Sequence, residues 1–384
     1  MNSHLNGQAK SDSGVVEREG CAVRGSLSRA LESPSYTASA NVCPPAGEYA
    51  DLKELLERKG LFVRQPVYDV LKIIFAIGLL ILSAVLLVVM RDFRLQILDA
   101  ALMAIVCTQL AFFFHDAGHG QIFQTDRMND VLGLILANLL LGWSYGRWVS
   151  SHNRHHAHPN QLDLDPDISD VPIVAFTEAQ ARKKLGPMRL LTKFQACCFP
   201  LLTLLSAFSW RIRSIQYVWQ KKVRYRSAEA MLLVAHSALY FGSVFFLLPV
   251  EKAVLFVLCH NALFGLYIGS VFAASHKGML YVGSESRLDF LRQQILSTRN
   301  IRAHPLSDLW YGPMACHIEH HLFPRIPRSK LAKARRTVKA FCLQRRIPYQ
   351  ETGGLRSYWD TLRHLHRVSA PLRRAVRQRH GCAI

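Results

Sequence analysis

Four long apolar segments dominate the pattern of hydrophobic and polar positions along the chain. They cover residues 68–90, 97–114, 231–249 and 253–275. Only Asp69, Lys72 and Asp99 carry charge within them. A helix needs roughly 20 mostly apolar residues to cross a bilayer, so the four segments qualify, the second barely. Buried core helices of a soluble protein are the alternative, but four such runs in two close pairs are rare in soluble folds.

Short connectors group these segments into two predicted helical hairpins. Residues 91–96 join the first pair and residues 250–252 join the second. The pattern therefore predicts an all-α integral membrane fold of four transmembrane helices, with both connectors on the outer face. The N-terminus, residues 115–230 and residues 276–384 then form a helical cap on the inner face. Excess Lys and Arg mark the cytoplasmic side, so we expect this cap and both termini to be cytosolic.

The remaining sequence suggests three regions. Residues 1–50 are rich in small and polar residues and are expected to be disordered. Residues 51–345 are expected to form the membrane domain, which begins with a helix over residues 51–59. Residues 346–384 are predicted to be a basic cytosolic tail.

Two shorter apolar stretches have a different length from the four spans. Residues 131–143 and 197–208 have only 13 and 12 residues. This length favours an interfacial, re-entrant or partly buried helix over a span. A cytosolic helix is also predicted over residues 325–345, which are rich in Lys and Arg.

The formal net charge of the chain is +20, and most of it lies in the predicted cap and tail. Such a charge is compatible with nucleic acid binding. We favour anionic lipid head groups, because the basic segment is tethered beside a bilayer. An acidic redox partner could bind the same surface.

Three histidine clusters stand beside or after the apolar segments. They hold eight of the 17 histidines, in the patterns HxxxH, HxxHH and HxxHH. The clusters are His115 with His119; His152 with His155 and His156; and His317 with His320 and His321. Residues three or four apart share one face of a helix, so each cluster can present its imidazoles to one side. A single HxxxH is most often an ordinary surface or core pair, but three clusters on one membrane face predict a common site.

Imidazole is a common ligand of iron, copper and zinc, and eight of them are too many for one ion. The pattern therefore predicts two metal ions at the membrane face. Within the clusters, Asp116, Asn153 and Glu319 are candidates to hold the second ring nitrogen of a ligand, although each is equally compatible with a solvated role. His158 lies just outside the second cluster and is expected to be structural or to contact a ligand.

The chain resembles the membrane fatty acid desaturases over about residues 60–345. The similar pieces are HDAGHG (115–120), SHNRHHAHPN (151–160), LDLDPDI (162–168), TRN (298–300) and HIEHHLFP (317–324). The resemblance implies a four-span fold with a non-haem di-iron centre and O₂-dependent insertion of a double bond into an acyl chain. It also implies His276 as a ninth ligand and Asn300 as an outer partner. No side chain need act as a separate acid or base.

The chain departs from the family pattern at three points. Phe272 stands where the acyl-CoA branch has an Asn, and His317 stands where the front-end branch typically has Gln. The HPGG haem motif of a fused cytochrome b5 domain does not occur in the sequence. The last two departures imply a separate electron donor, either ferredoxin-like or cytochrome b5-like, with its reductase.

Two other classes of function remain open at this level. Hydroxylases, acetylenases, and sterol or carotenoid oxygenases use similar histidine clusters, and the mass of the product separates them from a desaturase. A membrane zinc hydrolase or metal-binding receptor would also place imidazoles at a bilayer face. Zinc usually closes its shell with four ligands, so the number of histidines disfavours that class.

Overall fold

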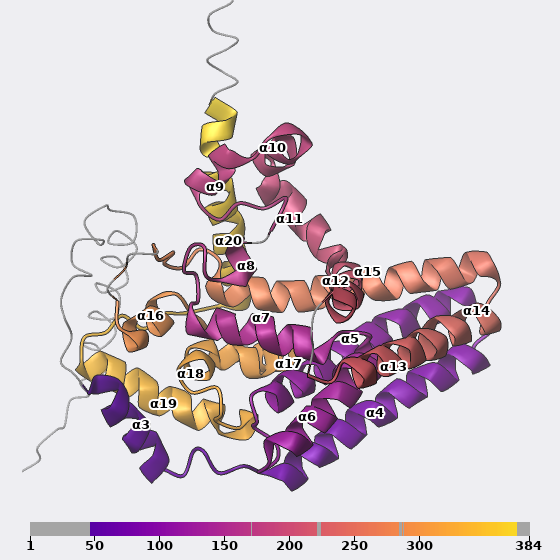
Figure 1. The fold of residues 1–384 in the computed structure, drawn as a ribbon, viewed down its shortest axis with the longest axis horizontal. Helices are drawn as coiled ribbons and strands as arrows, with labels where there is room; N and C mark the ends of the chain where they lie inside the picture. Colours follow the sequence, from indigo (N-terminus) through magenta and orange to yellow (C-terminus); the bar gives the residue numbers. More distant parts are fainter. Residues whose placement is uncertain (1–46, 170, 221–223, 284–285, 287, 375–384) are drawn as a thin grey trace, which may run out of the picture. The chain divides into compact units, whose positions relative to one another are not determined.

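Helices make up nearly all of the regular secondary structure in the computed structural model, which describes residues 47–169, 171–220, 224–283, 286 and 288–374 (Figure 1). The predicted disorder of residues 1–50 falls almost wholly outside these residues. The described parts of Gly47–Ser286 and of the chain from Phe290 onward form one compact unit. That unit is the subject of the following paragraphs.

Among the residues that the structure describes, four helices are long and apolar enough to cross a membrane, as predicted. They are α4 (Pro66–Val89), α5 (Phe93–Gly118), the run α13–η2–α14 (Arg226–Leu247) and α15 (Val250–His276). The third helix contains a π-helical segment, η2 (Ala238–Gly242). α5 packs against both α4 and α15, and α14 packs against α15. Each helix begins before the apolar run that predicted it, and α5 and α15 also extend beyond the end of that run.

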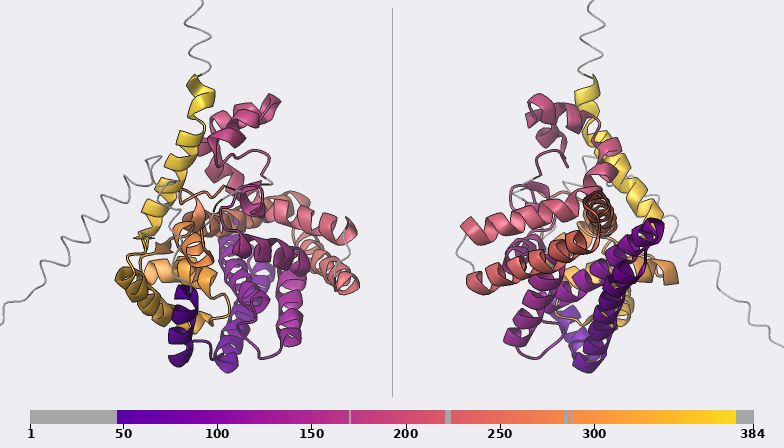
Figure 2. Two further views of the ribbon diagram at one scale, coloured as in Figure 1. Left: turned by 60° about the vertical axis from the view of Figure 1, so that its left-hand side comes forward. Right: turned by 90° about the vertical axis from the view of Figure 1, so that its right-hand side faces the viewer.

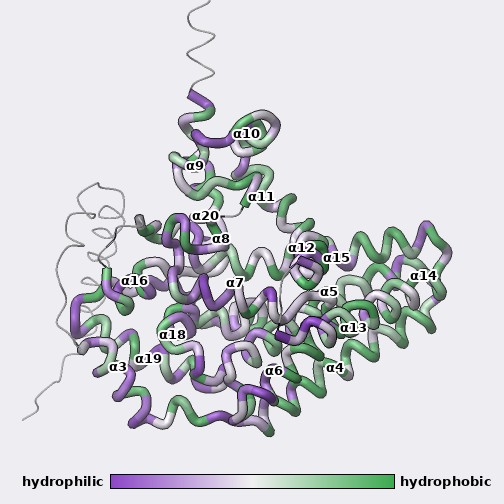
Figure 3. The backbone as a smooth tube through the Cα atoms, viewed as in Figure 1, coloured by the Kyte–Doolittle hydropathy of each residue, from purple (hydrophilic) through white to green (hydrophobic). Residues whose placement is uncertain are grey.

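The outer faces of these helices are apolar (Figure 3). On α4, Val67, Phe75 and Val89 are each more than half exposed, and Phe246 on α14 is 88% exposed. Exposed apolar patches that include several large side chains mark a surface that contacts lipid or another protein. The buried faces of α5 and α15 instead form the main hydrophobic core.

The remaining elements form the cap at the ends of α5 and α15 (Figures 1 and 2). Before α15 they are α3 (Glu48–Arg58), α6 (Asp126–Leu134), the π-helix η1 (Ile135–Leu141), α7 (Tyr145–Ala157), α8 (Pro166–Ser169), α9 (Glu178–Lys183), α10 (Gly186–Lys193), α11 (Gln195–Leu204) and α12 (Ser206–Gln220). After α15 they are α16 (Phe290–Leu296), β1 (Asn300–Ile301), α17 (Pro305–Tyr311), the 3₁₀ helix η3 (Gly312–Cys316), α18 (His317–Leu322), α19 (Arg328–Gln344), β2 (Glu351–Thr352) and α20 (Gly354–Val368).

The two shorter apolar stretches form short helices, in keeping with their length. Residues 131–143 are covered by the end of α6 and by η1, and residues 197–208 by α11 and the start of α12. α11 lies against α15 because two glycines allow close approach. A Cβ at Gly265 would lie 2.6 Å from the Thr203 carbonyl oxygen, and one at Gly269 would lie 2.8 Å from Thr203 Cβ.

The C-terminal segment differs from the expected tail. After residue 345, β2 pairs in parallel with β1, and α20 packs on α11 and α15. The buried face of α20 carries Ser357, Thr361, Leu365 and Val368. This face is half polar, so hydropathy alone did not indicate that the segment belongs to the packed structure.

Candidate metal centre

Nine buried histidines meet where four helices converge. α5 supplies His115 and its C-cap His119; α7 supplies His152, His155 and His156; α15 ends at His276; and α18 supplies His317, His320 and His321. All nine are at most 8% exposed. The structure thus brings together every histidine that the sequence proposed as a ligand.

Close packing between α5 and α7 brings the first two clusters into contact. A Cβ at Gly118 would lie 2.3 Å from Trp148 Cζ3, so only glycine lets Trp148 reach the end of α5. The Trp148 ring then stacks on His152, with ring centroids 4.3 Å apart. Ser144 caps α7 by accepting a hydrogen bond from Arg147 N, which begins the helix at the right point.

The nine histidines fall into two groups. The first group is His115, His119, His152, His156 and His320, whose nearest ring nitrogens all lie within 4.8 Å of one another. The second group is His155, His276 and His321, joined by His317, whose Nε2 is 2.9 Å from His276 Nε2. Adjacent histidines of one cluster therefore belong to different groups. This holds for His155 and His156, and for His320 and His321.

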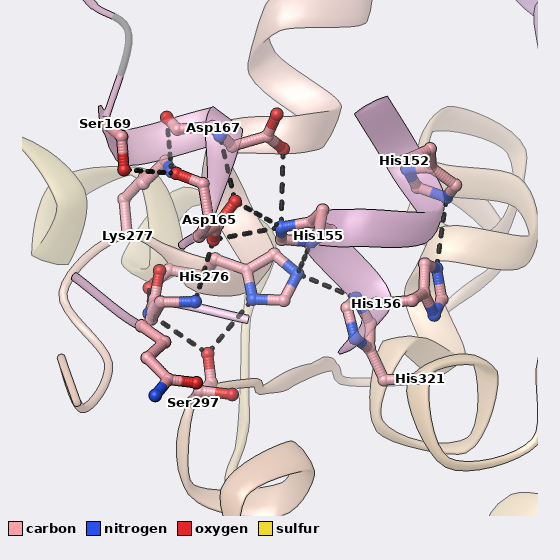
Figure 4. A network of polar contacts seen from close by, with 12 residues as sticks. His152, His155, His156, Asp165, Asp167, Ser169, His276, Lys277, Ser297 and His321 are labelled. Atoms are coloured by element: carbon pink, nitrogen blue, oxygen red, sulfur yellow. Dashed lines mark hydrogen bonds and ion pairs between the residues drawn. The ribbon is translucent and has the colours of Figure 1, made fainter. Parts of the chain in front are cut away.

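In the second group, outer hydrogen bonds fix which ring nitrogen carries the proton (Figure 4). His276 Nδ1 donates to the Ser297 carbonyl at 3.1 Å, and His155 Nδ1 donates to the Asp165 carboxylate at 3.0 Å. His321 Nδ1 lies 3.0 Å from Gln294 Oε1, which accepts because the Gln294 amide nitrogen donates elsewhere. In a neutral ring, a protonated Nδ1 leaves a lone pair on Nε2.

Three of these lone pairs point at one another. His276 Nε2 is 3.2 Å from His155 Nε2 and 3.0 Å from His321 Nε2. Lone pairs this close repel unless a cation lies among them. Separations of this size are also those of imidazole nitrogens around one ion with bonds of about 2.1 Å. The donor set therefore fits a metal ion.

The first group of histidines shows the same two features, an outer partner for one ring and buried ring nitrogens without a partner. His115 Nδ1 lies 3.2 Å from Asp116, whose other oxygen accepts from Arg328 Nε at 2.7 Å. The Nε2 atoms of His115 and His119 are buried and have no hydrogen-bond partner within the described part of the chain. Buried polar atoms are normally paired, so unpaired nitrogens that converge on one point also fit a metal ion.

Burial keeps most of these histidines neutral, which is the form that binds metals. Burial first, and neighbouring histidines second, lower the pKa well below its ordinary value at six positions outside the long apolar helices. These are His119, His152, His156, His317, His320 and His321. Burial would also lower the pKa of His155, but the charges of Asp165 and Asp167 outweigh it and raise that pKa.

The proposed outer partners lie in different places. Asp116 contacts His115, as described above. Asn153 is exposed, and the His158 ring bonds to the Gln161 side chain at 2.9 Å. Asn300 donates to Glu319 at 2.8 Å and accepts from Ile318 N at 2.8 Å. Asn300 and Glu319 thus hold the helix that carries the last cluster rather than a ligand ring.

Three outer partners were missed from the sequence: Asp165, Gln294 and Ser297. Asp165 lies in the LDLDPDI piece, ten residues after His155, and its position beside a histidine cluster was a usable signal. Gln294 and Ser297 lie far from any cluster in the sequence, and only the packing of α16 brings them to the site. We know of no pattern in one sequence that would reveal them.

The other histidines have ordinary partners. His236 Nδ1 bonds to the Leu139 carbonyl at 2.9 Å, and His260 Nδ1 to the Tyr240 hydroxyl at 2.5 Å. His304 is exposed and caps α17, so it is not near the site. His364 packs on Tyr281, and burial lowers its pKa to about 4.

Two hollows border the first group on different sides. A small apolar hollow of about 10 Å³ touches His115 and is lined by Ala111, Phe112, Phe114, Trp143, Trp148, Trp210, Ile268, Phe272 and Met314. A polar hollow of about 380 Å³, open to the surface, touches His119. The first group therefore borders closely packed apolar side chains on one side and a polar hollow on another.

These features define a helical protein with four apolar helices of membrane-spanning length and a buried site of nine histidines. A family model described as fatty acid desaturase matches residues 95–353. The chain belongs to the fatty acid desaturase family, as the resemblance predicted. Members of this family are membrane-associated enzymes that act on acyl lipids, so the predicted class of enzyme, an oxidoreductase of lipid metabolism, is confirmed.

Three relatives illustrate the similarity. An acyl-lipid (9-3)-desaturase of Physcomitrium patens is 29% identical over 79% of this chain, which spans 59% of that protein. A Delta(6)-fatty-acid desaturase of Caenorhabditis elegans is 29% identical over 78% of this chain and 70% of its own length. A Delta(8)-fatty-acid desaturase of Euglena gracilis is 29% identical over 79% of this chain and 74% of its own length.

Proposed function

We propose that this chain inserts a double bond into the acyl chain of a lipid, using O₂ and two iron ions held by the nine histidines. The observation that carries this proposal is the convergence of imidazole lone pairs at two points in a member of the desaturase family. His115, His119, His152, His156 and His320 would hold one ion, and His155, His276, His317 and His321 the other. The names of the relatives refer to different double-bond positions, so the proposal leaves the position open.

Iron suits this ligand set and reaction better than zinc. Imidazole ligands are compatible with both metals, but zinc has no accessible redox change. When bound, two irons supply the redox chemistry that couples O₂ to the removal of two hydrogens from adjacent methylenes. Overall, the –CH2–CH2– unit, O₂, two electrons and two protons give –CH=CH– and two waters. The protein supplies ligands, orientation and a dry site.

The apolar hollow beside His115 is the proposed place of the reacting methylenes, and because its volume is only about 10 Å³ the surrounding rings must shift to admit an acyl chain. Phe112, Phe114 and Phe272 line it, and Trp143 stacks on Phe264 behind it with ring centroids 4.8 Å apart. Aromatic walls exclude water and fix the path of an acyl chain without hydrogen bonds. The order of these hydrophobic contacts along the acyl chain then determines which of its carbons lie next to the metal ions.

The same proposal includes the membrane arrangement. α4 and α5 form one transmembrane hairpin, and α13–η2–α14 and α15 form the other. The cap with its histidines, and both termini, lie on the cytosolic face, where Lys277 follows the last span. Electrons come from a separate donor, ferredoxin-like or cytochrome b5-like with a reductase.

The first prediction tests the reaction itself. We expect the purified full-length chain to contain two irons and little zinc, and to convert an acyl substrate to a product two hydrogens lighter in the presence of O₂ and reduced donor. Elemental analysis and mass spectrometry of the acyl product are the measurements. A product heavier by one oxygen would indicate a hydroxylase, and zinc in place of iron would refute the proposal.

A second prediction concerns Asp165. Replacing Asp165 with Asn keeps the shape but removes the charge that orients His155 and strengthens its Nε2 as a ligand. Loss of such an outer partner typically lowers metal affinity or activity about 10–100-fold. Iron content after graded chelation would measure this loss. Asp163→Asn is the control, because Asp163 is exposed; equal iron retention in both variants would contradict the role of Asp165.

A further inference from the structure

The proposed function leaves the polar hollow beside His119 without a role. Its polar rim is formed by Asp126, Asp130, Asn153, Arg224 and Arg325, and His119 lies at its floor. The apolar hollow touches His115 instead. His115 and His119 are one helical turn apart, so the two hollows reach the same group of histidines from different sides.

Salt bridges hold the rim in place. Arg325 pairs with Asp126 at 3.4 Å, and Arg224 pairs with Asp130 at 3.2 Å. Asp130 also accepts hydrogen bonds from the hydroxyls of Tyr145 and Tyr225, at 3.2 and 3.0 Å. The two arginines are still 62% and 76% exposed, so they can contact a second molecule without breaking these pairs.

Because the nine histidines are buried, this hollow bears on how electrons could reach them. None of the nine is more than 8% exposed, and the proposed reaction needs two electrons from a protein that cannot enter the site. A carrier must therefore stop at the surface, where one ligand is closest to it. Of the nine, His119 is the one that borders the polar hollow.

We propose that this hollow is the docking site of the electron donor, an acidic one-electron carrier protein whose redox group comes to rest over His119. Each encounter would oxidise the carrier by one electron, and the His119 ring would be the closest route for that electron to the metal ions that the histidines would hold. Two encounters supply the two electrons of the proposed reaction, and this inference rests on that proposed function. The net charge of +20 favours an acidic partner by long-range attraction.

The test reverses charge at the rim. The double variant Arg224→Glu/Arg325→Glu is compared with Arg58→Glu/Arg356→Glu. The control arginines are 73% and 65% exposed, and each also pairs with one carboxylate, so the two variants match in exposure and pairing. Reduced soluble cytochrome b5 and reduced [2Fe–2S] ferredoxin serve as carriers. Linoleoyl phosphatidylcholine in nanodiscs and linoleoyl-CoA serve as acyl probes.

We expect the rim variant to raise the donor KM and the Kd for the carrier about tenfold or more, and to lose most of the salt dependence of binding. Turnover at saturating donor and the KM for the acyl probe should stay within about twofold of wild type. The control variant should match wild type. Binding is measured by interferometry and turnover by oxidation of the carrier.

Other outcomes overturn the inference. An unchanged donor KM in the rim variant, or an equal rise in the control, would exclude docking at this hollow. A rise in the KM for the acyl probe alone would make the hollow a substrate entrance. A wild-type chain that holds two irons but oxidises neither carrier in the presence of O₂ and acyl probe would refute the proposed function, and the docking site with it.

Discussion

Replacing His276 with alanine is expected to abolish turnover and to remove about half of the bound iron. His276 is the centre of the second group, since its Nε2 lies within 3.2 Å of the Nε2 atoms of His155, His317 and His321. Its removal leaves three ligands on one side of the proposed ion and an open space on the other. We expect activity to fall at least about 1000-fold, equivalent to roughly 4 kcal/mol of activation free energy.

The first group should survive this substitution. It has five histidines and does not include His276, so one ion should remain where two were bound. Elemental analysis and the amount of desaturated product are the measurements. The best control is His260→Ala, because His260 is also a buried histidine of α15, but it bonds to Tyr240 and not to the site. Two irons in the His276 variant would contradict the ligand assignment.

The sequence was enough to identify the long helices and the nine histidines. Apolar runs of about 20 residues and histidine spacings of three and four involve only residues that are close in the sequence. They can therefore be recognised without knowing how distant segments pack. His276 was found through the family resemblance alone. It stands alone at the end of α15, and no spacing rule distinguishes it from His260 on the same helix.

How the nine histidines divide into two groups could not be read from the sequence. Successive residues on an α-helix point about 100° apart, so His155 and His156 face different centres. The division depends on how α7 is placed against α5, α15 and α18, and the contact of Gly118 on α5 with Trp148 on α7 fixes part of that placement. These are long-range contacts that a single sequence does not reveal.

The outer partners were harder to predict for the same reason. Asn153 and Glu319 lie inside clusters, but Asn153 is exposed and Glu319 bonds to Asn300 and Tyr349 instead of a histidine ring. Apart from Asp116, the partners that contact the histidine rings come from other elements: Asp165 from the loop before α8, Gln294 from α16, and Ser297 after it. Proximity in sequence was therefore a poor guide to proximity at the site.

Arg299 lies at the junction between the site and the C-terminal helix. Its side chain is 4% exposed, and it donates to the carbonyl of Ala274 at 2.7 Å and to the carbonyl of Lys277. These carbonyls belong to the last turn and the C-cap of α15, which otherwise lack partners within the helix. The same guanidinium lies 3.8 Å from Asp360 on α20. Arg299 thus helps to fix the end of the helix that carries His276, together with Ser357 and Thr361 of α20, which donate to the same two carbonyls.

Replacing Arg299 with Met should therefore lower both stability and iron content. Hydrogen bonds to a charged group contribute about 1.5–3 kcal/mol each to stability, so we expect a loss of that order when the bonds from Arg299 to the Ala274 and Lys277 carbonyls are removed. Lysine should not restore stability, since an ammonium cannot donate in the planar fork that reaches both carbonyls and Asp360. The measurements are the apparent Tm and the iron content of the purified protein.

Arg302→Met is the matched control for this substitution. Arg302 is three residues further along the chain and is exposed, so the same change in charge and size removes no buried contact. We expect its Tm and iron content to equal those of wild type. If Arg299→Met also kept its Tm and both irons, the end of α15 would not depend on this guanidinium. Ser357 and Thr361 of α20, which donate to the Ala274 and Lys277 carbonyls, would then be enough to hold the helix end that carries His276.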